Sequence, residues 1–172
     1  MYTIDSKDTV VQITDLPQSS VGAPCPMILA GEHHLHLAYY LEERLSDWDG
    51  KTVRIVGENT SGEPVALVTF SRAYAHMFGP PNDEAFHGHP LSSRGLRPYR
   101  VYEVKDSSWL RGLERMNAIH PYHRREHFDN YHHFVFAFHD TTFECLAESF
   151  QATAHRGSVL DILEKALKEM RG

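Results

Sequence analysis

Hydrophobic and polar residues alternate along several short stretches of the chain, and this pattern predicts mainly β-strands. Residues 9–14 (TVVQIT) favour a short strand, and residues 27–41 alternate with a period of two from His34 onward, which also favours a strand. Residues 51–72 contain two runs rich in β-branched residues around the turn sequence NTSG, so we expect a hairpin there. Residues 98–105 (PYRVYEVK) predict a further strand.

The most regular alternation predicts a hairpin of residues 132–139 and 143–150. Phe134, Phe136 and Phe138 share one face of it. With a connecting loop of either two or four residues centred on Thr141 and Thr142, we expect His139 to lie directly opposite Glu144. We also expect Cys145, on the phenylalanine face, to be a buried thiol and not a nucleophile.

Helical patterns are fewer. Residues 106–117 combine the possible N-cap residues Asp106, Ser107 and Ser108 with an apolar stripe (Trp109, Leu110, Leu113, Met116), and Pro121 marks where a second, short helix can begin. Residues 158–171 predict a terminal helix capped by Ser158. The fold class expected from these elements is α+β. We predict a single domain over residues 1–172, with one mostly antiparallel sheet of about seven or eight strands and two or three helices on one face.

Composition and charge limit the partners and the location that we expect for this protein. The formal net charge of -6 argues against nucleic acid as a partner, because nucleic-acid surfaces need clustered Lys and Arg. No apolar run approaches the length of about 18 residues that a membrane span requires, so we expect no membrane partner. The beginning of the chain lacks the features of a secretory signal, and the two cysteines form no CxxC pair. We therefore expect a soluble cytoplasmic protein with free thiols.

Histidines carry the candidate chemistry, and six of the thirteen lie in residues 120–140. Residues 123–127 (HRREH) resemble the H-x-x-E-H motif of the inverzincin metallopeptidases. On a helix, His123 and His127 would present their ring nitrogens on one face to a Zn²⁺ or Fe ion, and Glu126 would activate a bound water. The resemblance covers five residues only, and an exposed basic helix is the alternative interpretation.

Two further groups complete the candidate set. The expected pair of His139 and Glu144 could supply a third metal ligand and a base, or form a structural ion pair between strands. In the Gly- and Pro-rich residues 79–98, His87 and His89 could contact a ligand, and Arg94 and Arg97 could bind its carboxylate or phosphate group.

Two classes of function fit these patterns. The first is a histidine-rich metal-binding protein or metal-dependent enzyme that acts on a small anionic molecule. Its metal ligands would be His123, His127 and His139, and its base Glu126 or Glu144. The second is a non-catalytic module that neutralises or scaffolds a protein partner through Tyr and His side chains. Whether the histidines converge in space distinguishes the two, and sequence spacing does not determine it.

Overall fold

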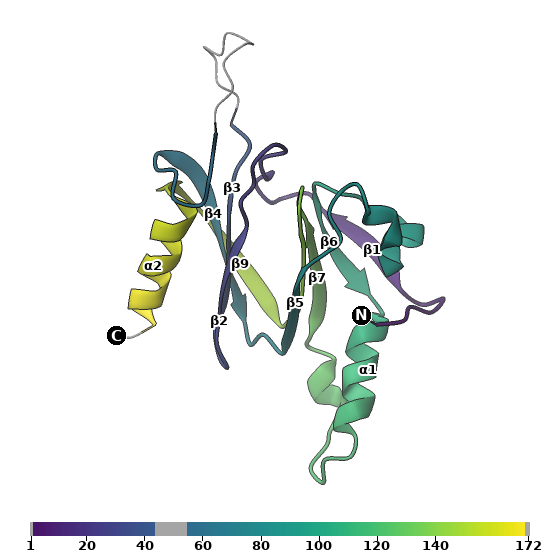
Figure 1. The fold of residues 1–172 in the computed structure, drawn as a ribbon. Coiled ribbons are helices and arrows are strands. Elements are labelled where there is room, and N and C mark those ends of the chain that lie inside the picture. Colours follow the sequence, from purple (N-terminus) through teal and green to yellow (C-terminus); the bar gives the residue numbers. More distant parts are fainter. Residues whose placement is uncertain (1, 44–54, 171–172) are drawn as a thin grey trace. The chain divides into compact units, whose positions relative to one another are not determined.

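The computed structural model describes residues 2–43 and 55–170. It confirms the α+β class, with two antiparallel sheets of five and four strands and two α-helices (Figure 1). The prediction of one sheet with seven or eight strands is wrong. The chain divides into two compact units, residues 1–16 with 70–150 and residues 17–69 with 151–172, and a single folding domain over residues 1–172 stays a prediction. Within the described ranges, no helix combines the length and the apolar character needed to cross a membrane.

The first unit contains the five-stranded sheet, in the order β1-β6-β7-β8-β5. All four pairings in this sheet are antiparallel. The predicted strands at residues 9–14 and 98–105 are confirmed, whereas β5 was not anticipated. The strands are β1 (Thr9–Ile13), β5 (Ala75–Gly79), β6 (Arg100–Lys105), β7 (His132–Ala137) and β8 (Thr142–Ala147).

The β7–β8 hairpin is confirmed, but its register differs from the prediction. Ala137 pairs with Thr142, and the amide of Phe138 donates to the carbonyl of Thr141 at 2.9 Å. The turn is therefore centred on His139 and Asp140 and not on the two threonines. Threonine is β-branched and favours a strand, whereas aspartate favours a turn, so the structure moves the turn toward Asp140. His139 consequently lies outside the strands, and Glu144 pairs with Val135.

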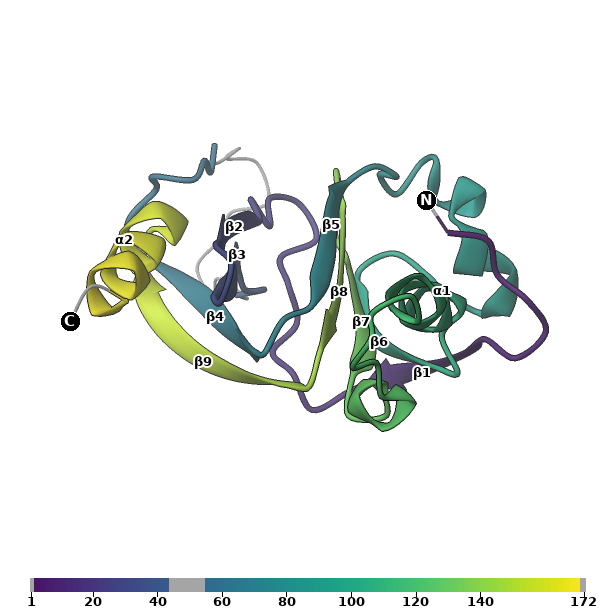
Figure 2. The ribbon, with the colours of Figure 1, turned by 90° about the horizontal axis from the view of Figure 1, so that it is seen from below.

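The helix α1 (Ser108–Asn117) begins where the sequence predicted, with Ser107 as N-cap. It lies beside β6 and β7 on one face of the five-stranded sheet (Figure 2), and its Trp109 ring meets His133 of β7 edge-on at 5.1 Å. The short helix expected after Pro121 is only a 3₁₀ helix, η3 (Arg125–Phe128). Residues 79–98 contain two more, η1 (Phe86–Gly88) and η2 (Pro90–Arg94).

The two faces of this sheet are packed differently. On one face, residues of η1 and η2 cover β6 and β7 in a cluster of Phe86, Leu91, Leu96, Tyr102, Val104, Val135 and Ala137. On the other face, phenylalanine rings pack against one another. Phe70 lies 5.9 Å from Phe136 and 5.5 Å from Phe143, and Phe134 lies 4.9 Å from Phe150 between ring centroids. Cys145 belongs to this second face and is buried, as predicted.

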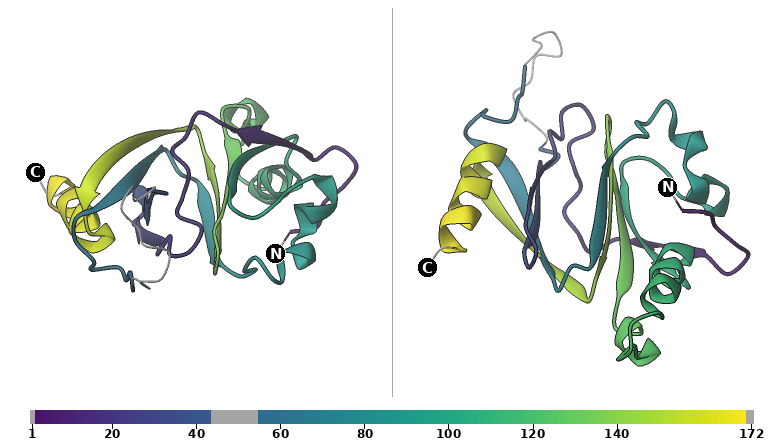
Figure 3. Two further views of the ribbon diagram at one scale, coloured as in Figure 1. Left: turned by 90° about the horizontal axis from the view of Figure 1, so that it is seen from above. Right: turned by 60° about the horizontal axis from the view of Figure 1, so that its bottom comes forward.

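The second unit contains the four-stranded sheet, in the order β2-β3-β4-β9, and the helix α2 (Figure 3). Ser158 caps α2 by accepting a hydrogen bond from the amide of Asp161 at 3.0 Å, as the sequence predicted. Its side chains Val159, Ile162 and Leu163 pack against the sheet. The elements are β2 (Met27–Ala30), β3 (Leu35–Tyr40), β4 (Glu63–Ser71), β9 (Ser149–Gly157) and α2 (Val159–Glu169).

Two predictions for this unit need correction. Residues 27–41 form a hairpin and not one strand, because the chain turns where the amide of Gly31 donates to the carbonyl of His34 at 2.8 Å. Of the hairpin expected at residues 51–72, the second strand is β4, residues 55–57 are not in a strand, and residues 51–54 lie outside the described residues. The strand β9 was not anticipated.

Candidate functional site

Glu144 is the centre of a buried polar cluster in the first unit. Its carboxylate projects from β8 onto the α1-side face of the sheet, and the residue is 4% exposed. His89 Nε2 lies 3.2 Å from Oε1, and His133 Nε2 lies 2.9 Å from Oε2. The Tyr2 hydroxyl donates to Oε2 at 2.6 Å. We call these four residues the Glu144 network.

The members of the network come from four segments of the chain. His133 and Glu144 are diagonal neighbours on one face of the β7–β8 ladder, since Val135 is opposite Glu144. His89 lies between η1 and η2, and Tyr2 lies in the N-terminal segment before β1. The Tyr2 ring stacks on Trp109 of α1 at a centroid distance of 5.7 Å, which holds its hydroxyl above the carboxylate.

The remaining ring nitrogens of the network also have partners. The amide of Leu91 donates to His89 Nδ1 at 3.1 Å, so the proton of this ring is on Nε2 and points to Glu144. His133 Nδ1 lies 2.9 Å from Ser107 Oγ, which in turn accepts from the amide of Leu110. Because an ionised carboxylate only accepts, His133 Nε2–H donates to Glu144, and Nδ1 shares its hydrogen bond with the Ser107 hydroxyl. Every ring nitrogen and both carboxylate oxygens are satisfied.

The electrostatics of the network favour an ionised carboxylate. Burial is the largest influence and opposes ionisation, but the hydrogen bonds from His133 and His89 outweigh it and lower the pKa of Glu144 to about 2. For the Tyr2 hydroxyl, burial and then the Glu144 charge act in the same direction and raise its pKa, so the phenol stays protonated. The network therefore consists of one anion with three surrounding donors.

The two histidines and the carboxylate of the Glu144 network are closed to solvent. The His89 and His133 side chains have no exposed surface, and that of Glu144 is 5% exposed. A general acid or base must come within hydrogen-bond distance of its substrate. The donors and acceptors of these groups are already hydrogen-bonded within the fold, so none faces a substrate. The arrangement supports the fold by joining β7, β8, the residues around η1 and η2, and the N-terminal segment.

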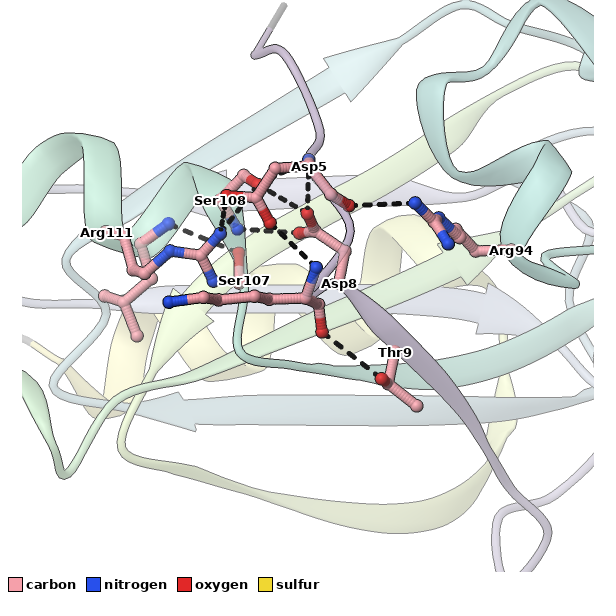
Figure 4. Close-up of polar contacts among 9 residues, drawn as sticks. Asp5, Asp8, Thr9, Arg94, Ser107, Ser108 and Arg111 are labelled. Atoms are coloured by element: carbon pink, nitrogen blue, oxygen red, sulfur yellow. Dashed lines mark hydrogen bonds and ion pairs between the residues drawn. The ribbon is translucent and has the colours of Figure 1, made fainter.

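The N-terminal segment is anchored a second time at the start of α1 (Figure 4). The buried Asp8 carboxylate accepts from the amide of Ser108 at 2.7 Å, from the Ser108 hydroxyl, and from the amide of Asp5 at 2.9 Å. Arg111 Nη2 donates to the Asp5 carboxylate at 2.5 Å, and Arg94 Nη2 donates to the Asp5 carbonyl at 3.0 Å. These bonds hold the segment that carries Tyr2.

The structure separates the predicted metal ligands. His123 precedes η3 and is bonded to α1, with Nε2 2.8 Å from Glu114 Oε1 and Nδ1 3.1 Å from Asn117 Oδ1. His127 and Glu126 lie within η3, so the helical spacing that would place His123 and His127 on one face does not form. Among the residues with described positions, no group of three or more His, Cys, Asp or Glu side chains is placed to hold a metal ion.

His139 does not face Glu144. It lies in the β7–β8 turn, with Nδ1 2.8 Å from Asp140 Oδ1 and Nε2 4.0 Å from Asp83 Oδ2. The hydrogen bond to Asp140 is the main reason that its pKa is raised. The two residues that had been expected to share a site are thus in different environments, one at a turn and the other in the core.

The residues predicted to contact a ligand around η1 and η2 also differ from one another. His89 is buried in the Glu144 network, whereas His87 is exposed. Arg94 holds the N-terminal segment, and Arg97 Nη1 donates to the carbonyls of Ser92 and Leu96 at 3.1 and 2.8 Å. Arg97 is exposed and lines a recess together with Tyr99 and Tyr102.

Sequence reasoning missed His133, Tyr2 and Ser107. The available signal was the alternation in residues 132–139, which places His133 on the same face as Glu144. A histidine and a glutamate in otherwise apolar strands indicate mutual burial, because an unpaired buried charge is costly. No local pattern connects Tyr2 to this pair, since its contact with Glu144 spans 142 positions.

A second candidate site is open to solvent. A groove of about 500 Å³ lies between β6, α1 and η3. Its basic side chains are Lys105, Arg111, Arg115, Arg125 and His132, and its acidic side chains are Glu103, Asp106, Glu114 and Asp129. Glu103 is bonded to Lys105 at 2.5 Å and to His132 at 2.6 Å, and Glu114 is bonded to His123.

Beside this groove, the chain after α1 forms a projecting loop, at the lower end of α1 in Figure 1. Three large apolar side chains are exposed in the last turn of α1 and in this loop: Met116 by 66%, Ile119 by 92% and Tyr122 by 84%. We call these three residues the apolar tip. The prediction that Met116 belongs to the buried stripe of α1 is wrong, because the helix extends beyond the sheet that would have covered its last turn.

Comparison with known proteins gives no relatives: no family model matches the chain, and neither a curated protein nor a solved structure is significantly similar to it.

Proposed function

We propose that this protein is a non-catalytic protein-binding module that docks on an acidic partner through the apolar tip and the adjacent groove. The observation that carries the proposal is the exposure of Met116, Ile119 and Tyr122 within seven positions of the chain. Exposed apolar side chains are common one at a time, but a group of them rimmed by polar residues is typical of protein interfaces.

Charge around the tip supports an acidic partner. Arg115, Arg124 and Arg125 are exposed next to the apolar side chains, although the whole chain has a formal net charge of -6. In the groove, the Glu103 carboxylate is bonded to Lys105 and the Glu114 carboxylate to His123. The Arg115 and Arg125 guanidinium groups have no bonded partner among the described residues. An acidic surface on the partner would be complementary to these arginines and would increase the association rate.

The composition of the tip also favours docking. Tyrosine, methionine and arginine are enriched in protein interfaces, and tyrosine buries a large area at a small cost in conformational entropy. A projecting loop can insert Ile119 and Tyr122 into an apolar depression of the partner, while the arginines contact carboxylates at its rim. This arrangement corresponds to a few central anchors surrounded by polar contacts.

The alternative proposal is a metal-dependent enzyme that uses Zn or Fe and acts on a small anionic molecule. It needs His123, His127 and His139 to share one ion, with Glu126 or Glu144 as base. In the folded chain His123 is bonded to Glu114 and Asn117, His139 to Asp140, and Glu144 to its own network. The binding module needs no such rearrangement, so we prefer it.

The test replaces Tyr122 with a photo-crosslinking phenylalanine analogue in the full-length chain. The protein that becomes crosslinked is identified, purified and titrated calorimetrically with unmodified chains. We expect Ile119→Ser with Tyr122→Ser to weaken binding by about a thousandfold, because central anchors each contribute about 2 kcal/mol or more and every 1.4 kcal/mol corresponds to about tenfold. We expect Arg124→Glu with Arg125→Glu to weaken binding about tenfold, and less at high salt.

The matched control is Leu160→Ser, which changes an apolar side chain on α2 that is 39% exposed. It should leave the affinity unchanged. Binding that is insensitive to the tip variants would overturn the proposal, as would a partner surface that lacks acidic groups. Binding of the tip to anionic lipid vesicles instead of a protein would also overturn it.

A further inference from the structure

The second unit contains two neighbouring histidines on the sheet face that α2 covers. Side chains alternate along β3, so His34, which directly precedes the strand, and His36 lie on the same face as Ala38, which packs with α2. The two imidazole rings are nearly parallel, with an interplanar angle of 8° and a distance of 6.5 Å between their centroids. We call these two residues the β3 histidine pair.

His36 is buried but has one unpaired ring nitrogen. The residue is 8% exposed, and Leu29 of β2 lies opposite it. Nδ1 lies 3.0 Å from Thr69 Oγ1, whereas Nε2 is buried without a hydrogen-bond partner among the described residues. Buried polar atoms nearly always have a partner, so this nitrogen indicates a ligand that the fold itself does not supply.

The other buried histidines of the described chain are paired completely. His89 and His133 are bonded through both ring nitrogens, to the Glu144 carboxylate on one side and to the amide of Leu91 or the hydroxyl of Ser107 on the other. Burial of a histidine in this protein therefore goes with full pairing, and His36 departs from that rule at Nε2.

We propose that the β3 histidine pair binds a divalent transition-metal ion such as Zn²⁺ through His36 Nε2 and a ring nitrogen of His34, with water in the remaining positions. Imidazole is a ligand that suits Zn²⁺, Ni²⁺ and Cu²⁺. In the bound state His36 Nδ1–H donates to Thr69 Oγ1, which leaves the lone pair on Nε2 and orients the ring. Two protein ligands make a weaker site than a closed centre with four.

The spacing of the two rings suits one shared ion. With metal–nitrogen bonds of about 2.1 Å, two imidazoles that share an ion have centroids at most roughly 6.6 Å apart. The observed distance of 6.5 Å lies within this limit. His34 is exposed and can turn toward the ion, whereas burial and the bond to Thr69 hold His36 in place.

Charges around the pair also favour a bound cation. Burial, and then the neighbouring His34, lower the pKa of His36, so its ring is neutral at neutral pH, as coordination requires. Glu169, the last residue of α2, acts on the same ring in the opposite direction, which indicates that its carboxylate lies near the pair. A nearby carboxylate stabilises the charge of a bound ion.

The experiment titrates the chelator-treated, tagless full-length protein with Zn²⁺ by calorimetry and follows the histidine ring signals by NMR. We expect one equivalent to bind with a dissociation constant of about 10 µM and to shift the ring signals of His34 and His36. Mg²⁺, which prefers oxygen ligands, should cause neither heat of binding nor ring shifts.

Variants then locate the site. His34→Gln should weaken Zn²⁺ binding by more than about tenfold, and Thr69→Val, which keeps the shape but removes the partner of Nδ1, by about tenfold. The matched control is His33→Gln, which changes an adjacent histidine whose side chain is 78% exposed, and it should leave the affinity unchanged. The amide spectrum of each variant verifies that the second unit is still folded.

Three results would overturn the inference. They are the absence of binding up to about 1 mM Zn²⁺, ring shifts confined to histidines of the first unit such as His123 and His127, and an equal loss of affinity in His33→Gln. The β3 histidine pair belongs to the second unit and the apolar tip to the first, so failure of either proposal leaves the other standing.

Discussion

The buried Glu144 network and the exposed segment around the apolar tip both contain histidines from residues 120–140, yet the two regions have opposite properties. His133 has a fully buried side chain with both nitrogens bonded. His120 and His127 are exposed, and His123 is bonded to one helix only. Histidine density in a sequence therefore does not indicate a common site; the partners and the burial of each ring decide its role.

The contribution of a hydrogen bond to the free energy of unfolding also differs between the two regions. In the core, water cannot replace a lost partner, so each group depends on the others. At the surface, water competes with every contact, and an ion pair between exposed side chains contributes little. Substitutions within the Glu144 network should therefore cost much more stability than substitutions at the apolar tip.

The largest effect should follow from Glu144→Gln. The substitution keeps the shape of the side chain but removes the charge that His89, His133 and Tyr2 surround. We expect the free energy of unfolding, measured with urea, to fall by about 3 kcal/mol, because disrupting a buried charge network leaves polar groups poorly paired. Glu148→Gln is the control, since its ion-pair partner Arg72 is 75% exposed. A loss under about 1 kcal/mol would contradict the role given to the network.

The same network should make stability depend on acid pH. Its donors hold the pKa of folded Glu144 at about 2, below the ordinary value of 4.5. Because the folded pKa is the lower one, the stabilisation is complete above about pH 4.5 and is lost as the pH falls toward about 2. The difference in unfolding free energy between wild type and Glu144→Gln should therefore shrink over this range. A difference that stays constant with pH would contradict the ionised state of the carboxylate.

A smaller effect is expected for Ser107→Ala. The Ser107 hydroxyl caps α1 and contacts His133 Nδ1, so the substitution removes an N-cap and one partner of a buried ring. We expect a loss of about 1–2 kcal/mol in urea unfolding. Ser93→Ala, at an exposed position of η2, should change the stability by less than about 0.5 kcal/mol. Equal effects of the two substitutions would show that Ser107 does not support the network.

The smallest effect on stability should come from the apolar tip. Ile119→Ser removes a side chain that is 92% exposed, so we expect the free energy of unfolding to change by less than about 0.5 kcal/mol. Urea unfolding measures this change, and the same variant should lose partner binding. A destabilisation above about 1 kcal/mol would mean that Ile119 packs within the fold and is not free to dock.

Local patterns predicted much of the secondary structure. The caps of α1 and α2, the strands β1 and β6, and the β7–β8 hairpin were predicted because each depends on neighbouring residues in the chain. The strand β5 and the strand β9 were not predicted, and the hairpin register was wrong. When the turn moves by two residues, every side chain of the hairpin stays on the same face of the sheet. The alternating pattern is therefore the same for both turns and could not decide between them.

The candidate site shows more clearly which features local sequence patterns do not predict. Alternation along the strands was enough to place His133 and Glu144 on one face, and the abundance of Gly and Pro was enough to place Arg97 in an irregular segment. Only the tertiary structure brought His89 and Tyr2 to the Glu144 carboxylate, kept His123, His127 and His139 apart, and exposed Met116 at the end of α1. The physical reason is that burial and pairing arise from contacts between distant segments, which periodicity along the chain does not record.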